Sequence, residues 1–169
     1  MKTKTFFLFS LLLILTSFNK LSAQDFYLHA NGVTCMCPDA AIGDEGVVNG
    51  ITYTKRSVEQ ITEYNADTTC TSGISNMSEL FRHKGGFNDD IGSWDVSHVT
   101  NMKFMFADAD SFNQDIGSWD VSNVSNMESM FEEDENFNQD IGDWDVSNVT
   151  NVKKMFKKCL KEPIILMAI

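Results

Sequence analysis

The stretch "FNQDIGSWDVSNVSNMESMF", which runs from Phe112 to Phe131, has a near-copy on each side. The copy before it is "FNDDIGSWDVSHVTNMKFMF" (87–106), and the copy after it is "FNQDIGDWDVSNVTNVKKMF" (137–156). The copies begin at 87, 112 and 137, a step of 25 residues. One unit of this size cannot bury its own apolar side chains, so a fixed step predicts a stacked array whose core is closed by neighbouring repeats.

Each repeat is predicted to pair a short strand with a short helix. In "SWDVS", Trp94 and Val96 alternate with polar residues, which is the period of a half-buried strand. Met102, Met105 and Phe106 follow at i, i+3 and i+4, which indicates one apolar helix face. The expected helix N-caps are Thr100, Ser125 and Thr150. The glycines expected to turn the backbone with positive φ are Gly92, Gly117 and Gly142.

The string "IGSWDVSNVSNMESMF" resembles the repeat of bacterial BspA-like leucine-rich-repeat surface proteins, whose hallmark is W-D-V/T-S-N-V-T-N-M-x-x-M-F. The resemblance is strong over residues 70–158, and the segment "FYLHANGVTCMCPDAAIGDEGVVNGITYTKR" is similar to a leader found in some members. It implies an exported, non-enzymatic surface protein. The expected fold class is therefore an α/β repeat, a leucine-rich-repeat-like solenoid of short parallel strands and short helices, with a small β-rich N-terminal cap.

The chain divides into four parts. Residues 1–23 are typical of a signal peptide, because two lysines precede a short apolar run that ends before Ala23. Residues 24–69 are interpreted as an N-terminal cap with hairpins at Asn31–Gly32 and Asn49–Gly50. The repeats cover 70–161, as a partial copy (70–86) and then 87–111, 112–136 and 137–161. Residues 162–169 form an atypical tail, either a small hydrophobic cap or the mark of a shortened chain.

The net negative charge of the chain limits the classes of molecule that it can bind. The formal net charge is −11, and it becomes −14 once Lys2, Lys4 and Lys20 leave with the signal peptide, which has no acidic residue. Such a chain repels nucleic acids and anionic membranes, and its electrostatic complements are divalent cations or basic protein surfaces. No membrane span is expected after signal cleavage, and the protein is expected to be secreted or attached to the cell surface.

The four cysteines allow one disulfide in an exported protein. Cys37 or Cys35 is expected to pair with Cys70, and the alternative is a set of free, buried thiols. Cys159 lies in the atypical end of the chain and is a candidate to stay unpaired.

Two ladders of recurring side chains are candidate sites. Trp94, Trp119 and Trp144 are interpreted as core, with sugar stacking as the alternative. Asp95, Asp120 and Asp145 would face solvent. Like charges there repel between neighbouring rungs, a rung being the equivalent positions that one repeat contributes to the stack. Either each Asp bonds nearby backbone N–H groups in an Asx-turn, or Ca²⁺ bridges adjacent rungs.

The resemblance implies a non-catalytic protein-interaction or adhesion module without a cofactor, whose expected ligand is an extracellular protein or matrix component. The predicted binding face consists of Ser93, Asp95, Ser97, Ser118, Asp120, Ser122, Asp143, Asp145 and Ser147. One alternative is a structural segment of a larger adhesin with no ligand of its own. A second alternative, an enzyme with a site within 24–69, has no catalytic motif in its favour.

Overall fold

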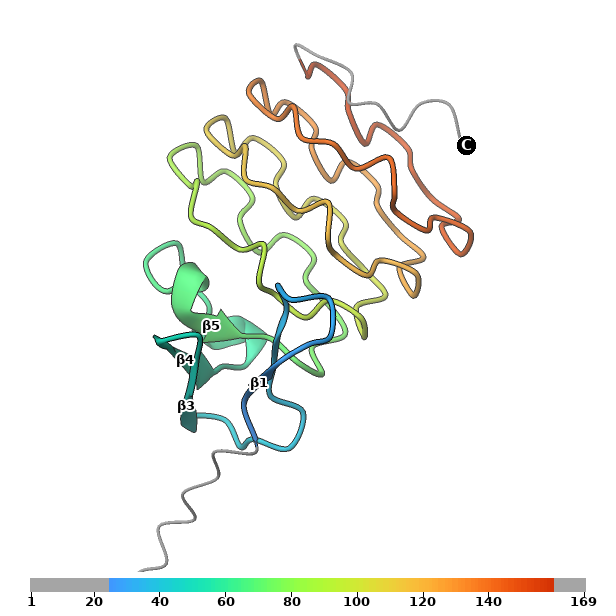
Figure 1. The fold of residues 1–169 in the computed structure, drawn as a ribbon. Helices are drawn as coiled ribbons and strands as arrows, with labels where there is room; N and C mark the ends of the chain where they lie inside the picture. Colours follow the sequence, from blue (N-terminus) through green and yellow to red (C-terminus); the bar gives the residue numbers. More distant parts are fainter. Residues whose placement is uncertain (1–24, 160–169) are drawn as a thin grey trace, which may run out of the picture.

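The computed structural model describes residues 25–159. The predicted signal peptide (1–23) and the predicted tail (162–169) lie outside the described residues. Figure 1 shows the repeats as a row of similar loops that begins at a small sheet and leads away from it, with the segment of β1 against the first loops.

The strands of the described residues all lie between 27 and 70, at or before the start of the repeats. β1 (Tyr27–Leu28) pairs with β2 (Cys35–Met36), and β3 (Glu45–Val48) pairs with β4 (Ile51–Lys55), both antiparallel. β5 (Thr69–Cys70) joins β4 in parallel, after the 3₁₀ helices η1 (Val58–Gln60) and η2 (Ala66–Thr68). The two predicted hairpins are confirmed. Asn49 and Gly50 have φ of 51° and 82°, as a tight two-residue hairpin turn requires.

The predicted α/β solenoid is wrong. Residues 25–159 contain no α-helix, and the repeats contribute only isolated parallel bridges, Asn76 to Asn101, Asn101 to Asn126 and Asn126 to Asn151. "SWDVS" is not a strand, and "TNMKFMF" is a run of turns rather than a helix. The structure is therefore one of small sheets followed by stacked turns.

Backbone hydrogen bonds between repeats replace the expected helix. The N–H groups of Met102, Phe104 and Phe106 donate to carbonyls of the next repeat, at 2.9, 3.0 and 2.9 Å. The N–H groups of Met105 and Ala107 donate to the carbonyls three residues earlier and close β-turns. Phe104 has a φ of 56°, a left-handed conformation that no α-helix contains, and it recurs at Glu79, Ser129 and Lys154.

The recurring hydroxyls and glycines also act between repeats. The hydroxyl of Ser125 donates to the carbonyl of Thr100 (3.1 Å), and that of Thr150 donates to Ser125 (3.0 Å), so they are not helix N-caps. Gly92, Gly117 and Gly142 do not have positive φ, contrary to the prediction. A Cβ at Gly117 would lie 2.7 Å from the carbonyl oxygen of Asp140, so this glycine is needed because the backbone of the next repeat approaches closely.

Ladders of equivalent aromatic side chains form the core. The Trp94 and Trp119 ring centroids are 6.4 Å apart, and those of Trp119 and Trp144 are 6.5 Å apart, with nearly parallel planes. All three rings are buried, which confirms the core interpretation. The indole N–H of Trp119 donates to the carbonyl of Ile91 in the preceding repeat (3.1 Å). The ladder thus joins repeats by apolar contact and by a satisfied polar group.

In the part of the chain that the structure describes, no helix has the length and apolar character needed to cross a membrane.

Candidate functional site

A clamp holds the N-terminal strands against the first full repeat. A disulfide joins Cys37 to Cys70, one of the two pairings that the sequence favoured. The N–H of Cys35 donates to the carbonyl of Ser93 (2.8 Å), and the hydroxyl of Thr71 donates to the carbonyl of Asp95 (3.0 Å). The cap and the first rung of the predicted binding face therefore form one continuous structure.

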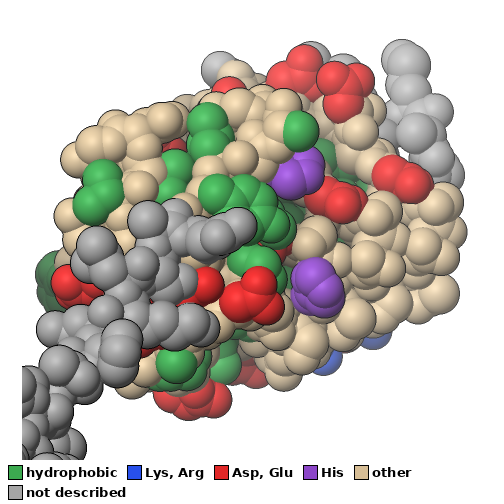
Figure 2. Space-filling view, turned by 60° about the horizontal axis from the view of Figure 1, so that its bottom comes forward, with side chains coloured by type: hydrophobic (Ala, Val, Ile, Leu, Met, Phe, Trp, Pro, Cys, Tyr) green, Lys and Arg blue, Asp and Glu red, His purple; other side chains and the backbone are tan. Residues whose placement is uncertain are grey.

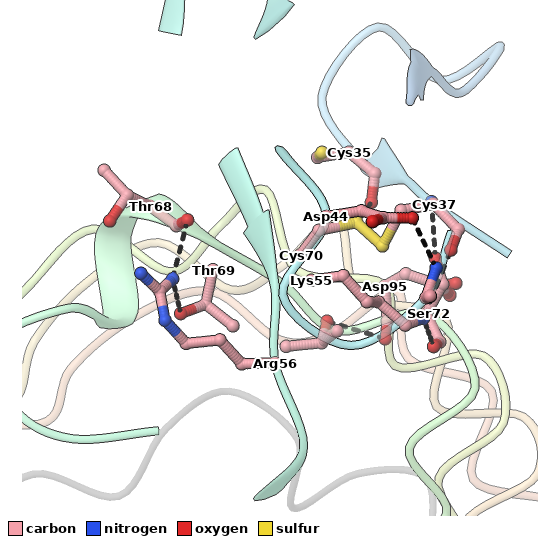
Figure 3. Close-up of a disulfide and its surroundings, with 12 residues drawn as sticks. Cys35, Cys37, Asp44, Lys55, Arg56, Thr68, Thr69, Cys70, Ser72 and Asp95 are labelled. Carbon is pink, nitrogen blue, oxygen red and sulfur yellow. Dashed lines mark hydrogen bonds between the residues drawn. A yellow bond between two sulfur atoms is a disulfide. The ribbon is translucent and has the colours of Figure 1, made fainter. Parts of the chain in front are cut away.

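Lys55 is the buried cation of this clamp, and the sequence interpretation missed it. Its ammonium group donates to the carbonyls of Cys37 and Ser72 beside the disulfide, and Figure 3 shows Asp95 close by. Burial lowers the pKa of Lys55, and the negative charge of Asp95 opposes that shift. The sequence of β4 could have indicated this buried lysine, because strand alternation places Lys55 on the same buried face as Tyr53.

Cys35, the other cysteine of the Cys35-x-Cys37 pair, has a thiol of low reactivity. Cys35 is a free cysteine that is fully buried. Burial, together with the nearby charge of Asp95, raises the pKa of its thiol to about 12. The thiolate, which is the reactive form, is therefore scarce at neutral pH.

Each Asp of the ladder is held by a serine two residues later. Oδ1 of Asp120 accepts hydrogen bonds from the backbone N–H (3.1 Å) and the hydroxyl (2.6 Å) of Ser122. Asp95 makes the same bonds with Ser97, and the N–H of Ser147 donates to Asp145. The Ser147 hydroxyl, and next its backbone N–H, lower the pKa of Asp145 by hydrogen bonding to the carboxylate. The Asx-turn interpretation is confirmed, because the local donors hold each carboxylate.

The weaker calcium interpretation of Asp95, Asp120 and Asp145 gains no support from the arrangement. Within residues 25–159, no group of three or more His, Cys, Asp and Glu side chains is placed to hold a metal ion.

The predicted binding face is only partly open. In its first rung, Asp95 is 3% exposed, and Ser93 and Ser97 are half-buried beside the cap. The residues of the next two rungs are exposed, except Ser122, which is half-buried. We call this open part the Asp–Ser edge, and it consists of Ser118, Asp120, Ser122, Asp143, Asp145 and Ser147.

Charge is segregated between the two sides of the repeats. The segments 87–100, 112–125 and 137–150 contain no Lys or Arg, whereas their acidic residues are Asp89, Asp90, Asp95, Asp115, Asp120, Asp140, Asp143 and Asp145. The turn segments carry the lysines, which pair with acids there, as Lys103 does with Glu128 (2.8 Å). Among the described residues, no ion pair involves any of those eight Asp. The face in Figure 2 shows Asp, Glu and His, with Lys and Arg only at its margin.

A small cleft lies where the β1–β2 hairpin meets the Asp–Ser edge. Its volume is about 70 Å³. We call it the junction cleft, and it is lined by His29, Asn31, Thr34, Met36, Trp94, Asp95, Val96, Ser97, Ser118 and Asp120. Oδ2 of the buried Asp95 has no hydrogen-bond partner among the residues that the structure describes. The cleft therefore combines an unsatisfied buried carboxylate oxygen with a second, exposed carboxylate from Asp120.

A larger, open hollow lies on the turn side. It has a volume of about 550 Å³, and its lining runs from Glu63 and Tyr64 to the segment 83–89. Lys84 and Glu63 form an ion pair there, with 3.2 Å between Nζ and Oε2. Burial raises the pKa of Asp89 at its edge.

Comparisons with known proteins bear on the repeat region. Residues 51–164 match the family model described as "Mycoplasma protein of unknown function, DUF285". The curated proteins and the solved structures gave no match. The matched span covers more than half of the chain, including β4, β5 and every described repeat. The chain therefore belongs to the DUF285 family.

Proposed function

We propose that this protein is an exported, non-catalytic interaction module whose Asp–Ser edge binds a basic surface on an extracellular protein. The observation that carries the proposal is the segregation of charge, since the repeat segments that form the edge contain acidic residues and no Lys or Arg. A surface of one sign steers an oppositely charged partner and repels others. The resemblance to BspA-like surface proteins, together with the signal-like N-terminus, supports an extracellular setting.

The geometry of the edge supports binding to an extended surface. Equivalent carboxylates recur at each 25-residue step, and each is oriented by its own serine, as Asp120 is by Ser122. A partner that contacts several rungs gains several weak, exposed charge interactions at once, each of about 0.2–1 kcal/mol. The edge therefore fits a basic protein better than a single small ion.

The first test compares the full chain with a triple variant, Asp120→Asn, Asp143→Asn and Asp145→Asn, by surface plasmon resonance against purified matrix proteins of high and low isoelectric point. Asn preserves the Asx-turn acceptor, so the variant is expected to fold. We expect the wild type to bind basic proteins, and the variant to bind them about tenfold more weakly. The binding should also weaken as salt screens the charges.

A matched control removes the same charge from the turn side, by Glu79→Gln, Asp108→Asn and Glu135→Gln. These residues are exposed and lie outside the Asp–Ser edge. We expect this variant to bind like the wild type. Equal binding by the wild type and the edge variant would contradict the proposal, and it would favour a structural segment of a larger adhesin with no ligand of its own.

A further inference from the structure

We propose that the junction cleft is a binding site for a primary ammonium group, namely a lysine side chain of the partner protein. This inference rests on the proposed function, and it identifies the residue type that anchors the basic partner. It assigns a role to the hairpin of β1 and β2, which the Asp–Ser edge alone leaves without one.

The buried carboxylate of Asp95 carries the inference. Asp95 differs from Asp120 and Asp145 because the cap covers it, and its side chain is 3% exposed. Oδ1 is satisfied by Ser97, whereas Oδ2 is buried without a hydrogen-bond partner among residues 25–159. A buried carboxylate oxygen without a hydrogen-bond partner is unfavourable, so a donor that reaches it is favoured.

Lys55 does not supply that donor. Its ammonium group is directed to the carbonyls of Cys37 and Ser72, and it forms no ion pair with Asp95 within the described residues. Figure 3 shows the two side chains as neighbours near the disulfide. Lys55 thus partly offsets the Asp95 charge through space, and it leaves the carboxylate able to accept a further hydrogen bond.

The size and the lining of the cleft favour an ammonium group. A volume of about 70 Å³ admits a compact head group and part of its methylene stem. Asp95, Asp120 and the hydroxyls of Ser97 and Ser118 offer acceptors, and an ammonium group has three donors to match them. Met36, which is half-buried, supplies apolar surface for the stem of a lysine side chain.

The test is a titration of the ¹⁵N-labelled full chain with N-acetyl-lysine N-methylamide, monitored by NMR at the amides of Ser97, Ser118 and Asp120. The uncharged control probe is N-acetyl-norleucine N-methylamide. We expect the lysine probe to shift these amides saturably at millimolar concentration and the norleucine probe to leave them unchanged. Asp95→Asn should weaken lysine binding about tenfold, because it removes a charge-assisted hydrogen bond.

Ser118→Lys provides a second test that leaves the buried clamp intact. Ser118 is exposed at the cleft, so a lysine there places a tethered ammonium group in the proposed site. We expect this variant to lose the saturable shifts, whereas Glu135→Gln, on the turn side and outside the cleft lining, should keep them. Lysine shifts that match those of norleucine would overturn the inference, and so would shifts produced by Ca²⁺ but not by lysine.

The outcome is separable from that of the proposed function. If Ser118→Lys bound basic proteins as strongly as the wild type while the Asp–Ser edge variant did not, the cleft proposal would fail and the proposed function would stand. If the cleft bound the lysine probe but no basic protein bound the edge, the proposed function would fail alone.

Discussion

Replacing both Cys37 and Cys70 with serine is expected to lower the free energy of unfolding by about 3–4 kcal/mol. The disulfide closes a loop with a sequence separation of 33 residues, so its loss restores much conformational freedom to the unfolded chain. It also removes the covalent link between the β1–β2 hairpin and the start of the repeats. Urea unfolding followed by circular dichroism measures the change.

Cys159→Ser is the matched control for this prediction. Cys159 is a free, half-buried cysteine whose thiol donates to the carbonyl of Phe131, so the substitution changes sulfur to oxygen without breaking a disulfide. A loss of less than about 1 kcal/mol is expected there. If the control lost as much stability as the double variant, the disulfide would not be the source of the effect.

Asp134→Asn is expected to stabilise the protein above neutral pH by roughly 2–4 kcal/mol. The pKa of Asp134 is raised from 3.8 to about 7, chiefly by burial and to a smaller extent by the charge of nearby Asp110, against the opposing effect of the N–H groups of Asn136 and Phe137. Asn keeps the oxygen that accepts those two N–H groups, and it removes the buried charge. At high pH the wild type is less stable because it must keep the charged Asp134 carboxylate buried.

The direction of the pH dependence of stability follows from the raised pKa of Asp134. Between about pH 4 and pH 7 the folded state holds a proton on Asp134 that the unfolded state has released, so wild-type stability falls as the pH rises. Thermal unfolding between about pH 4 and pH 8 should show this loss in the wild type and a smaller loss in Asp134→Asn. Asp115→Asn, at an exposed site, should follow the wild type. Parallel profiles for the wild type and Asp134→Asn would refute the assignment.

The repeat step, the core ladders and the hairpins could be predicted from the sequence. Trp94 packs on Trp119, its equivalent 25 positions later. The recurrence of the same residue at a fixed step therefore indicates directly which side chains are in contact. The turn at Asn49–Gly50 was predictable because few residue pairs tolerate two consecutive positive φ values.

The helix prediction failed because apolar spacing does not distinguish a helix from a chain of turns. Met102, Met105 and Phe106 are all buried as predicted, but their N–H groups bond across repeats or close β-turns. Asn101 was the local signal against a helix, since its side chain accepts the N–H of Lys103 and forms an Asx-turn. The same bond recurs at Asn76 and Asn126.

The candidate site was only partly predictable, because contacts distant in sequence decide which rung is covered. Asp95 has the same local sequence as Asp120, yet the β1–β2 hairpin buries the first and leaves the second exposed. The repeat sequence alone therefore could not predict that Asp95 is buried and Asp120 is exposed. The role of Lys55 likewise depends on its carbonyl partners Cys37 and Ser72, each about 17 or 18 residues away.

The central claim is that the repeats are joined in a 25-residue register by backbone hydrogen bonds, which aligns the Asp residues into one edge. Scalar coupling across the hydrogen bond in NMR tests it most directly, because it identifies the carbonyl that each N–H contacts. The account predicts a coupling between the amide nitrogen of Phe104 and the carbonyl carbon of Glu128. A coupling from Phe104 to the carbonyl of Thr100, four residues earlier, would mean a helix and would contradict the account.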